Sequence, residues 1–107
     1  MAPRAVAVLA ALAVLAFAAP ARADAIDGAW CLASTGRMVI DGPAIQTPGG
    51  ARITGDYSRH AFRYIVPAGE PGAGSEVHMI LLGEEAVQVQ VGAGPARTWH
   101  RCGPDVS

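Results

Sequence analysis

The sequence predicts an all-β fold, a small antiparallel meander of seven or eight short strands that closes, or nearly closes, into a barrel. All 13 glycines and six of the eight prolines lie at or after Gly28, so from Gly28 onward only residues 56–66 form an unbroken segment longer than eight residues. Glycine and proline cost about 1 and 3 kcal/mol in a helix interior, which disfavours long helices. Between these breakers, apolar residues stand at alternate positions, which is typical of half-buried strands. A two-sheet sandwich is the alternative architecture.

The clearest strand is Ala86–Val91, where strict alternation places Val87, Val89 and Val91 on one face and two glutamines on the other. Residues 76–82 form a second apolar run. The intervening residues 83–85 supply a turn, so the two runs predict a hairpin.

The remaining strands are shorter and are separated by turn residues. Residues 61–66 place Phe62, Tyr64 and Val66 on one side, and residues 52–57 form another strand with a β-bulge expected at Gly55. The other expected strands are residues 29–34, 37–40, 44–47 and 97–102. Their connections carry glycine, proline, aspartate and threonine, as tight turns do.

The first 23 residues predict a cleaved signal peptide, leaving residues 24–107 as a single small β domain. Arg4 is followed by an apolar run over residues 5–18, and then by Pro20 and a small-residue cleavage site ending at Ala23. An apolar run of 14 residues is shorter than the roughly 20 that span a bilayer as a helix. The sequence therefore predicts a periplasmic or secreted protein with no stable membrane insertion after cleavage.

The charge of the mature domain excludes one class of partner. All eight basic residues are arginines, and two of them, Arg4 and Arg22, leave with the signal peptide, so six arginines face nine acids. Nucleic acids and anionic membranes attract concentrated positive charge, which this domain lacks. We therefore expect no nucleic-acid partner.

The two cysteines, Cys31 and Cys102, stand near the two ends of the mature chain. An even cysteine count in an exported domain predicts a disulfide, whereas metal-binding and redox cysteine pairs lie close together in sequence. A disulfide needs its Cα atoms about 5.5–6 Å apart. The predicted bond would therefore bring the first and last strands to pairing distance, which favours the barrel.

The sequence contains no recognisable catalytic, metal-binding or cofactor-binding motif. The three histidines, His60, His78 and His100, lie on or beside different expected strands, without the spacing of a metal site. Asp56, Ser58 and His60 share a strand face, but strand neighbours two residues apart lie about 6.6–6.8 Å apart, too far for a nucleophile and its base. We expect no enzyme activity and no cofactor.

A second group of residues predicts a binding surface. Tyrosine, arginine and histidine are concentrated in residues 56–64 and again near Cys102, and aromatic and arginine side chains are enriched at binding hot spots. The candidate surface residues are Tyr57, Arg59, His60, Arg63 and Arg101. The alternative, which we favour for the other aromatic residues, is that Trp30, Phe62, Tyr64 and Trp99 fill the core.

The one long loop covers residues 67–75 and carries a single charge, at Glu70. Its composition of proline, glycine and alanine predicts a crossover at one end of the barrel rather than a binding lid.

The opening Gly28-Ala29-Trp30-Cys31 and the closing Trp99-His100-Arg101-Cys102 resemble those of small exported bacterial β-proteins with no assigned activity. The segment Gly28-Ala29-Trp30 is also similar to the first motif of lipocalins, although 84 mature residues fall short of a full lipocalin. These resemblances imply a small barrel and no particular activity.

We therefore expect a non-enzymatic domain that binds a protein or small ligand through one barrel end. The alternative is a small inhibitor of a hydrolase of the protease or lysozyme type, which would present residues 67–75 or residues 57–64 to its target.

Overall fold

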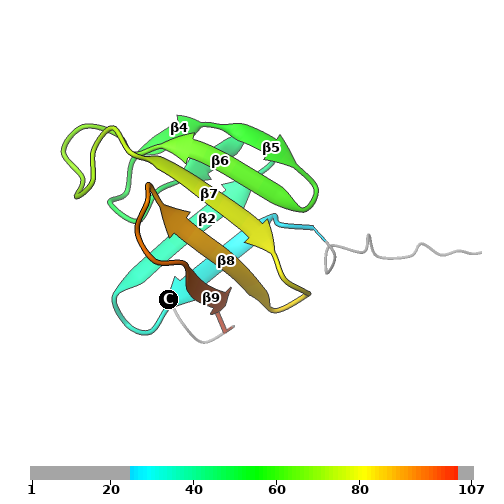
Figure 1. Cartoon of the computed structure of the whole chain (residues 1–107). Coiled ribbons are helices and arrows are strands. Elements are labelled where there is room, and N and C mark those ends of the chain that lie inside the picture. Colours follow the sequence, from blue (N-terminus) through cyan, green and yellow to red (C-terminus); the bar gives the residue numbers. More distant parts are fainter. Residues whose placement is uncertain (1–24, 104–107) are drawn as a thin grey trace, which may run out of the picture.

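The computed structural model describes residues 25–103 and contains nine β-strands and no helix in that range (Figure 1). The strands are β1 (Gly28–Leu32), β2 (Gly36–Asp41), β3 (Ala44–Gln46), β4 (Arg52–Thr54), β5 (Asp56–Ser58), β6 (Ala61–Ile65), β7 (Glu76–Leu81), β8 (Ala86–Val91) and β9 (Arg97–Arg101). The predicted all-β class is confirmed. The predicted signal peptide lies outside the described residues, and no helix within them is long and apolar enough to cross a membrane.

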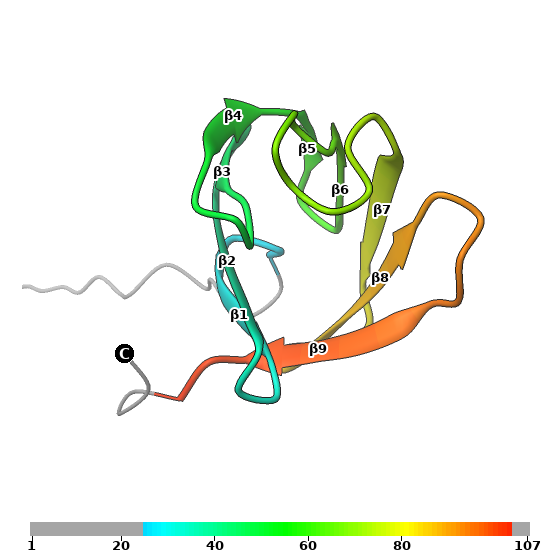
Figure 2. The same ribbon diagram turned by 90° about the vertical axis from the view of Figure 1, so that its left-hand side faces the viewer.

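The strands form one antiparallel sheet in the order β4-β3-β2-β1-β9-β8-β7-β6-β5. Every ladder joins strands adjacent in sequence except one, in which β1 pairs with β9 through Trp30–Arg101 and Cys31–His100. The two ends of the sheet, β4 and β5, follow one another in the chain, so the sheet curls into a nearly closed barrel (Figure 2). This arrangement confirms the barrel and excludes the sandwich.

Strands β4 and β5 are two halves of one bent strand that divides at Gly55. The first half pairs with β3 and the second half with β6. The Gly55 N–H donates to the Pro43 carbonyl at 2.9 Å. Gly55 therefore lies opposite Pro43, the next pair in the register of the β3–β4 ladder. The bulge expected at Gly55 is therefore wrong, since a bulge adds an extra residue and this strand has none.

Gly55 is required at the bend because the chain passes very close to β6 there. A Cβ atom at this position would collide with the Arg63 carbonyl oxygen and with the Phe62 ring. Glycine lets the backbone make this approach, so the chain can leave the β3 ladder of β4 and enter the β6 ladder of β5.

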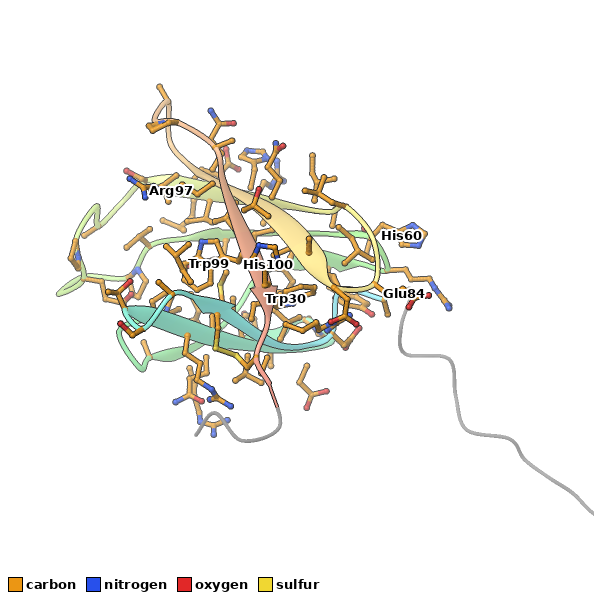
Figure 3. The ribbon with its side chains drawn as sticks, turned by 90° about the horizontal axis from the view of Figure 1, so that it is seen from below. Trp30, His60, Glu84, Arg97, Trp99 and His100 are labelled. Atoms are coloured by element: carbon orange, nitrogen blue, oxygen red, sulfur yellow. A yellow bond between two sulfur atoms is a disulfide. The ribbon has the colours of Figure 1, made fainter. Side chains whose placement is uncertain are left out.

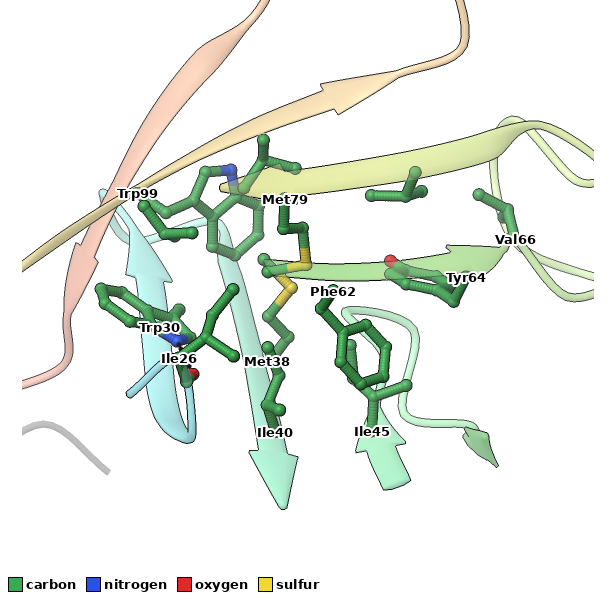
Figure 4. Packing of buried hydrophobic residues seen from close by; sticks show 13 residues of the cluster. Ile26, Trp30, Met38, Ile40, Ile45, Phe62, Tyr64, Val66, Met79 and Trp99 are labelled. Atoms are coloured by element: carbon green, nitrogen blue, oxygen red, sulfur yellow. Dashed lines mark hydrogen bonds between the residues drawn. The ribbon is translucent and has the colours of Figure 1, made fainter. Parts of the chain in front are cut away.

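Inward-facing side chains from β1, β2, β3, β6, β7, β8 and β9 fill the barrel (Figure 4). The buried cluster consists of Ile26, Trp30, Met38, Ile40, Ile45, Phe62, Tyr64, Val66, Val77, Met79, Val87, Val89 and Trp99. All four aromatic residues predicted for the core are in it. Val91 is an exception to the predicted alternation: it is 44% exposed, because β8 ends there at the rim of the barrel.

The disulfide between Cys31 and Cys102 joins the first strand to the residue that follows the last one. Its Cα atoms are 5.1 Å apart, and the Cys102 N–H donates to the Ala29 carbonyl at 3.1 Å. The disulfide thus reinforces a pair of strands that the β1–β9 ladder already joins, as the sequence predicted.

Candidate functional site

The two ends of the barrel differ in how they are covered. The turn at residues 42–43, the turn at 59–60 and the connection at 82–85 lie at one end, together with the N-terminal segment 25–27; we call this the plugged end. Residues 33–35, 47–51, 66–75 and 92–96 connect the strands at the other end, which we call the mouth.

Four of the five predicted binding residues, Tyr57, Arg59, His60 and Arg101, lie at the plugged end, and Arg63 lies on the outer face of β6. Figure 3 shows His60 and Glu84 at this end and Arg97, at the start of β9, at the other.

The N-terminal segment closes the plugged end. Ile26 is fully buried, and its backbone N–H donates to the Arg59 carbonyl at 2.8 Å. Asp27 accepts hydrogen bonds from the Tyr57 hydroxyl and, at 2.8 Å, from the Gly42 N–H. Tyr57 and Arg59 therefore help to hold this segment across the barrel.

Arg101 binds the same segment from β9. All three nitrogens of its guanidinium group donate to backbone carbonyls: Nη2 to Ala25, Nη1 to Asp27 and Nε to Glu84. The guanidinium carbon also lies 4.0 Å from the centre of the Trp30 ring, within the range of a cation–π contact. These four contacts give Arg101 a structural role at the plugged end.

Arg63 belongs to a row of charged groups on the outer surface of the sheet. Its guanidinium group forms ion pairs with Asp56 at 2.8 Å and with Glu76 at 3.1 Å, and Glu76 also contacts His78 at 3.1 Å. The hydrogen bond to Asp56 and the negative charges of Glu76 and Asp56 raise the pKa of Arg63. Because the row is solvent-exposed, its contribution to stability is small.

The described residues bring together neither Ser58 and His60 nor a metal-binding cluster. The Ser58 hydroxyl donates to the Ala61 carbonyl at 3.4 Å, and no hydrogen bond joins it to His60 within residues 25–103. No cluster of three or more histidine, cysteine, aspartate or glutamate side chains could hold a metal ion in this part of the chain.

The mouth contains a pocket of about 340 Å³. Its lining is formed by Pro48, Gly49, Tyr64, Val66, Glu70, Pro71, Val77 and Val91. Most of these side chains are apolar, and Glu70 is the only charged one among them. A small concave site that combines an apolar lining with a few polar groups is typical of ligand-binding pockets.

The loop between β6 and β7 forms one wall of the pocket and extends beyond the strands in Figure 1. Its backbone is bonded to itself, from Ala73 N–H to the Glu70 carbonyl at 3.0 Å and from Gly74 N–H to the Val66 carbonyl at 2.9 Å. The loop joins two neighbouring antiparallel strands, so it is a long hairpin connection and the predicted crossover is wrong; it also forms part of the lining of the mouth.

A side-chain contact attaches this loop to the turn between β3 and β4. The Thr47 hydroxyl donates to the Glu70 carboxylate at 2.5 Å and accepts from the Ala51 N–H at 3.0 Å. Thr47 is 1% exposed, so this hydrogen bond lies under the surface of the mouth. A Cβ atom at Gly49 would collide with the Glu70 carboxylate, so the absence of a side chain there makes room for the contact.

Tyr64 carries a buried hydroxyl beside this pocket. The residue is 6% exposed, and its hydroxyl has no hydrogen-bond partner within residues 25–103. Burial, together with the negative charge of Glu70, raises the pKa of Tyr64 to about 12. The hydroxyl is therefore protonated at neutral pH and can act as a donor.

The sequence did not identify the mouth as a site. The sequence predicts Tyr64 in the core, Thr47 at the end of a strand, and residues 67–75 as a crossover or, in the inhibitor alternative, as a loop presented to a hydrolase. One signal was available, the single charge at Glu70 in an otherwise uncharged loop. Its partner, Thr47, is 23 residues away in the chain, and no local pattern links the two.

Comparison with known proteins finds no matching family model, no matching curated protein and no matching solved structure.

Proposed function

We propose that this protein is a non-enzymatic, exported binding domain that takes a small, largely apolar ligand in the pocket at the mouth of the barrel. The observation that carries this proposal is the chemistry of the pocket: an apolar lining of Val66, Val77, Val91 and two prolines beside the single carboxylate of Glu70. Because that carboxylate is the only charge in the lining, an uncharged or cationic ligand fits better than an anion.

The buried Tyr64 hydroxyl supports the same proposal. Tyr64 lines the pocket, so a ligand that supplies an acceptor there gains a hydrogen bond from this hydroxyl. At the plugged end, Ile26 fills the interior of the barrel and Arg101 bonds the segment that lies across it.

The test uses phenylnaphthylamine, an uncharged apolar fluorophore that brightens on leaving water. We expect saturable binding to the oxidised mature protein, and at least about tenfold weaker binding after Val91→Arg, which places a charged side chain at the rim of the pocket. Ile80→Arg is the matched control, because Ile80 is exposed to a similar extent, 51% against 44%, on the outer face of β7. Equal binding by both variants would contradict a site at the mouth.

Inhibition of a hydrolase is the second candidate function, and the loop 66–75 favours it. This loop is held in one shape by its own backbone hydrogen bonds and by the contact between Glu70 and Thr47, and its tip is exposed. A pre-organised loop loses little entropy when it binds an enzyme cleft. Titration of hen lysozyme, trypsin and subtilisin with the mature protein tests this function. Inhibition that disappears with Ala68→Arg would favour the inhibitor over the ligand-binding domain.

A further inference from the structure

We propose that the free edge of β4 is a second binding site, separate from the mouth, which takes an extended peptide by strand addition. The peptide would run antiparallel to β4, with an apolar residue opposite Ile53 and an acidic residue opposite Arg52.

The first step is the direction of the backbone groups in β4. The Gly55 N–H bonds Pro43 and the Ala51 carbonyl accepts from Thr47, so residues 51, 53 and 55 face β3. Backbone groups alternate in direction along a strand. The N–H and C=O groups of Arg52 and Thr54 therefore point away from β3, toward β6.

The second step is the direction of the backbone groups in β6. The His60 carbonyl accepts from Leu81, and the Val66 N–H donates to Ser75, so the even-numbered residues of β6 face β7. Arg63 faces the other way and pairs with Asp56. Ile65, two residues further along, also faces away from β7.

The ladder between the bent strand and β6 stops before it reaches Ile65. In the same register Thr54 would pair with Ile65, but the ladder begins only at Asp56. The pair after that would join Arg52 to Pro67, which has no N–H to donate. Within residues 25–103, the backbone groups of Arg52, Thr54 and Ile65 on this side consequently have no strand partner.

The space beside this edge is accessible. A surface pocket of about 280 Å³ lies where β4 turns away from β6, and its lining includes Thr54, Gly55 and Ile65. Arg52 and Thr54 are exposed. An unpaired strand edge of this kind is the surface to which extended peptides add, with backbone hydrogen bonds providing the affinity.

The side chains around the edge determine which peptide fits. Arg52 points outward and forms no ion pair with any other described residue, so an acidic side chain directly opposite would gain one. Ile53 points toward the barrel and packs against the core, so an apolar residue suits the position opposite it. The row of Asp56, Arg63 and Glu76 nearby is already paired internally and carries one net negative charge, so Arg52 is the cation on this side that an acidic side chain can pair with.

The probe is a blocked pentapeptide, acetyl-Thr-Thr-Val-Glu-Thr-amide, titrated into the isotope-labelled oxidised mature protein. We expect the amide resonances of Arg52, Thr54 and Ile65 to move and the amide exchange of Arg52 and Thr54 to slow. N-methylation of the glutamate should abolish binding, since this N–H faces β4. N-methylation of the valine should leave it unchanged, because that N–H faces away.

Reversal of the charge at position 52 tests whether the peptide must carry an acidic residue opposite it. Arg52→Glu should weaken binding of the glutamate peptide at least about fivefold and should strengthen binding of the same peptide with lysine in place of glutamate. Arg37→Glu, at an exposed arginine on β2, is the matched control and should change neither affinity.

Three results would overturn the proposal. The first is equal binding of the two N-methylated peptides. The second is that peptide binding shifts only the amide resonances of the mouth, such as those of Tyr64 and Val91. Concentration-dependent shifts at β4 without peptide would instead make a second copy of this chain the occupant.

Discussion

The guanidinium carbon of Arg101 lies 4.0 Å from the centre of the Trp30 ring, and the same side chain donates to three backbone carbonyls around it. Trp30 in turn donates its indole N–H to the Ile26 carbonyl at 2.8 Å. The last strand, the first strand and the segment before the first strand therefore meet at two adjacent side chains. Gly28 permits this arrangement, since a Cβ atom there would collide with the Arg101 guanidinium.

Arg101→Lys should destabilise the domain by about 2–4 kcal/mol, because lysine cannot reproduce the planar set of donors and stacks less well on an indole ring. Arg97→Lys on the same strand is the control, and its exposed side chain predicts a change within about 0.5 kcal/mol. Urea unfolding followed by tryptophan fluorescence measures both. Equal stabilities of the two variants would show that the contacts at the plugged end contribute nothing.

Gly55→Ala should destabilise the domain by about 1–3 kcal/mol, since the new methyl group meets the Arg63 carbonyl and the Phe62 ring. Gly83→Ala is the matched control, because no atom lies within 4 Å of a Cβ at that position. We expect its stability to change by less than about 1 kcal/mol. A Gly55→Ala protein as stable as this control would mean that the bend does not depend on glycine.

Reduction of the Cys31–Cys102 disulfide should lower the free energy of unfolding by about 4 kcal/mol, the loop-entropy value for two residues 71 positions apart. In a domain of this size such a loss lowers the melting temperature by more than about 15 °C. Scanning calorimetry of the oxidised protein and of the Cys31→Ser/Cys102→Ser double variant measures the difference. Coincident transitions would argue against stabilisation by the bond.

The stability of the domain should fall as the pH rises from about 10 to about 12. The pKa of Tyr64 is about 12 in the folded state, against 10.0 for an unperturbed tyrosine, so the unfolded chain releases this proton first. The contribution is present in full below pH 10 and is lost as the pH rises through the folded pKa. It amounts to about 2–3 kcal/mol.

Tyr64→Phe removes this ionisation and should flatten the stability profile over that pH range. Urea unfolding at a series of alkaline pH values provides the measurement. A Tyr64→Phe profile as steep as the wild-type one would assign the alkaline loss to other groups.

The fold could be predicted because its strongest determinants are local. Alternation along Ala86–Val91 and along β6 specified which face is buried, and the glycines and prolines specified where strands end. The positions of Cys31 and Cys102 added the one long-range constraint, which was enough to choose a barrel over a sandwich.

The sites could not be predicted because they depend on relationships between distant residues. The sequence predicts Arg101 and Tyr57 as surface residues from their side-chain types. In the structure both donate hydrogen bonds to the segment 25–27. The contact of Thr47 with Glu70 and the free edge of β4 depend on loop geometry and on the registers of two separate ladders. No short pattern in the sequence encodes either.

The closing disulfide also determines what a protease can do to this protein. The bond connects the chain across a separation of 71 residues, so every strand from β2 to β9 lies within one covalent ring. A single cut in any loop between the cysteines, including the exposed tip of residues 66–75, opens the ring but releases no fragment. Two cuts between the cysteines are needed before a piece can leave, so the disulfide keeps a singly cleaved chain in one covalent molecule.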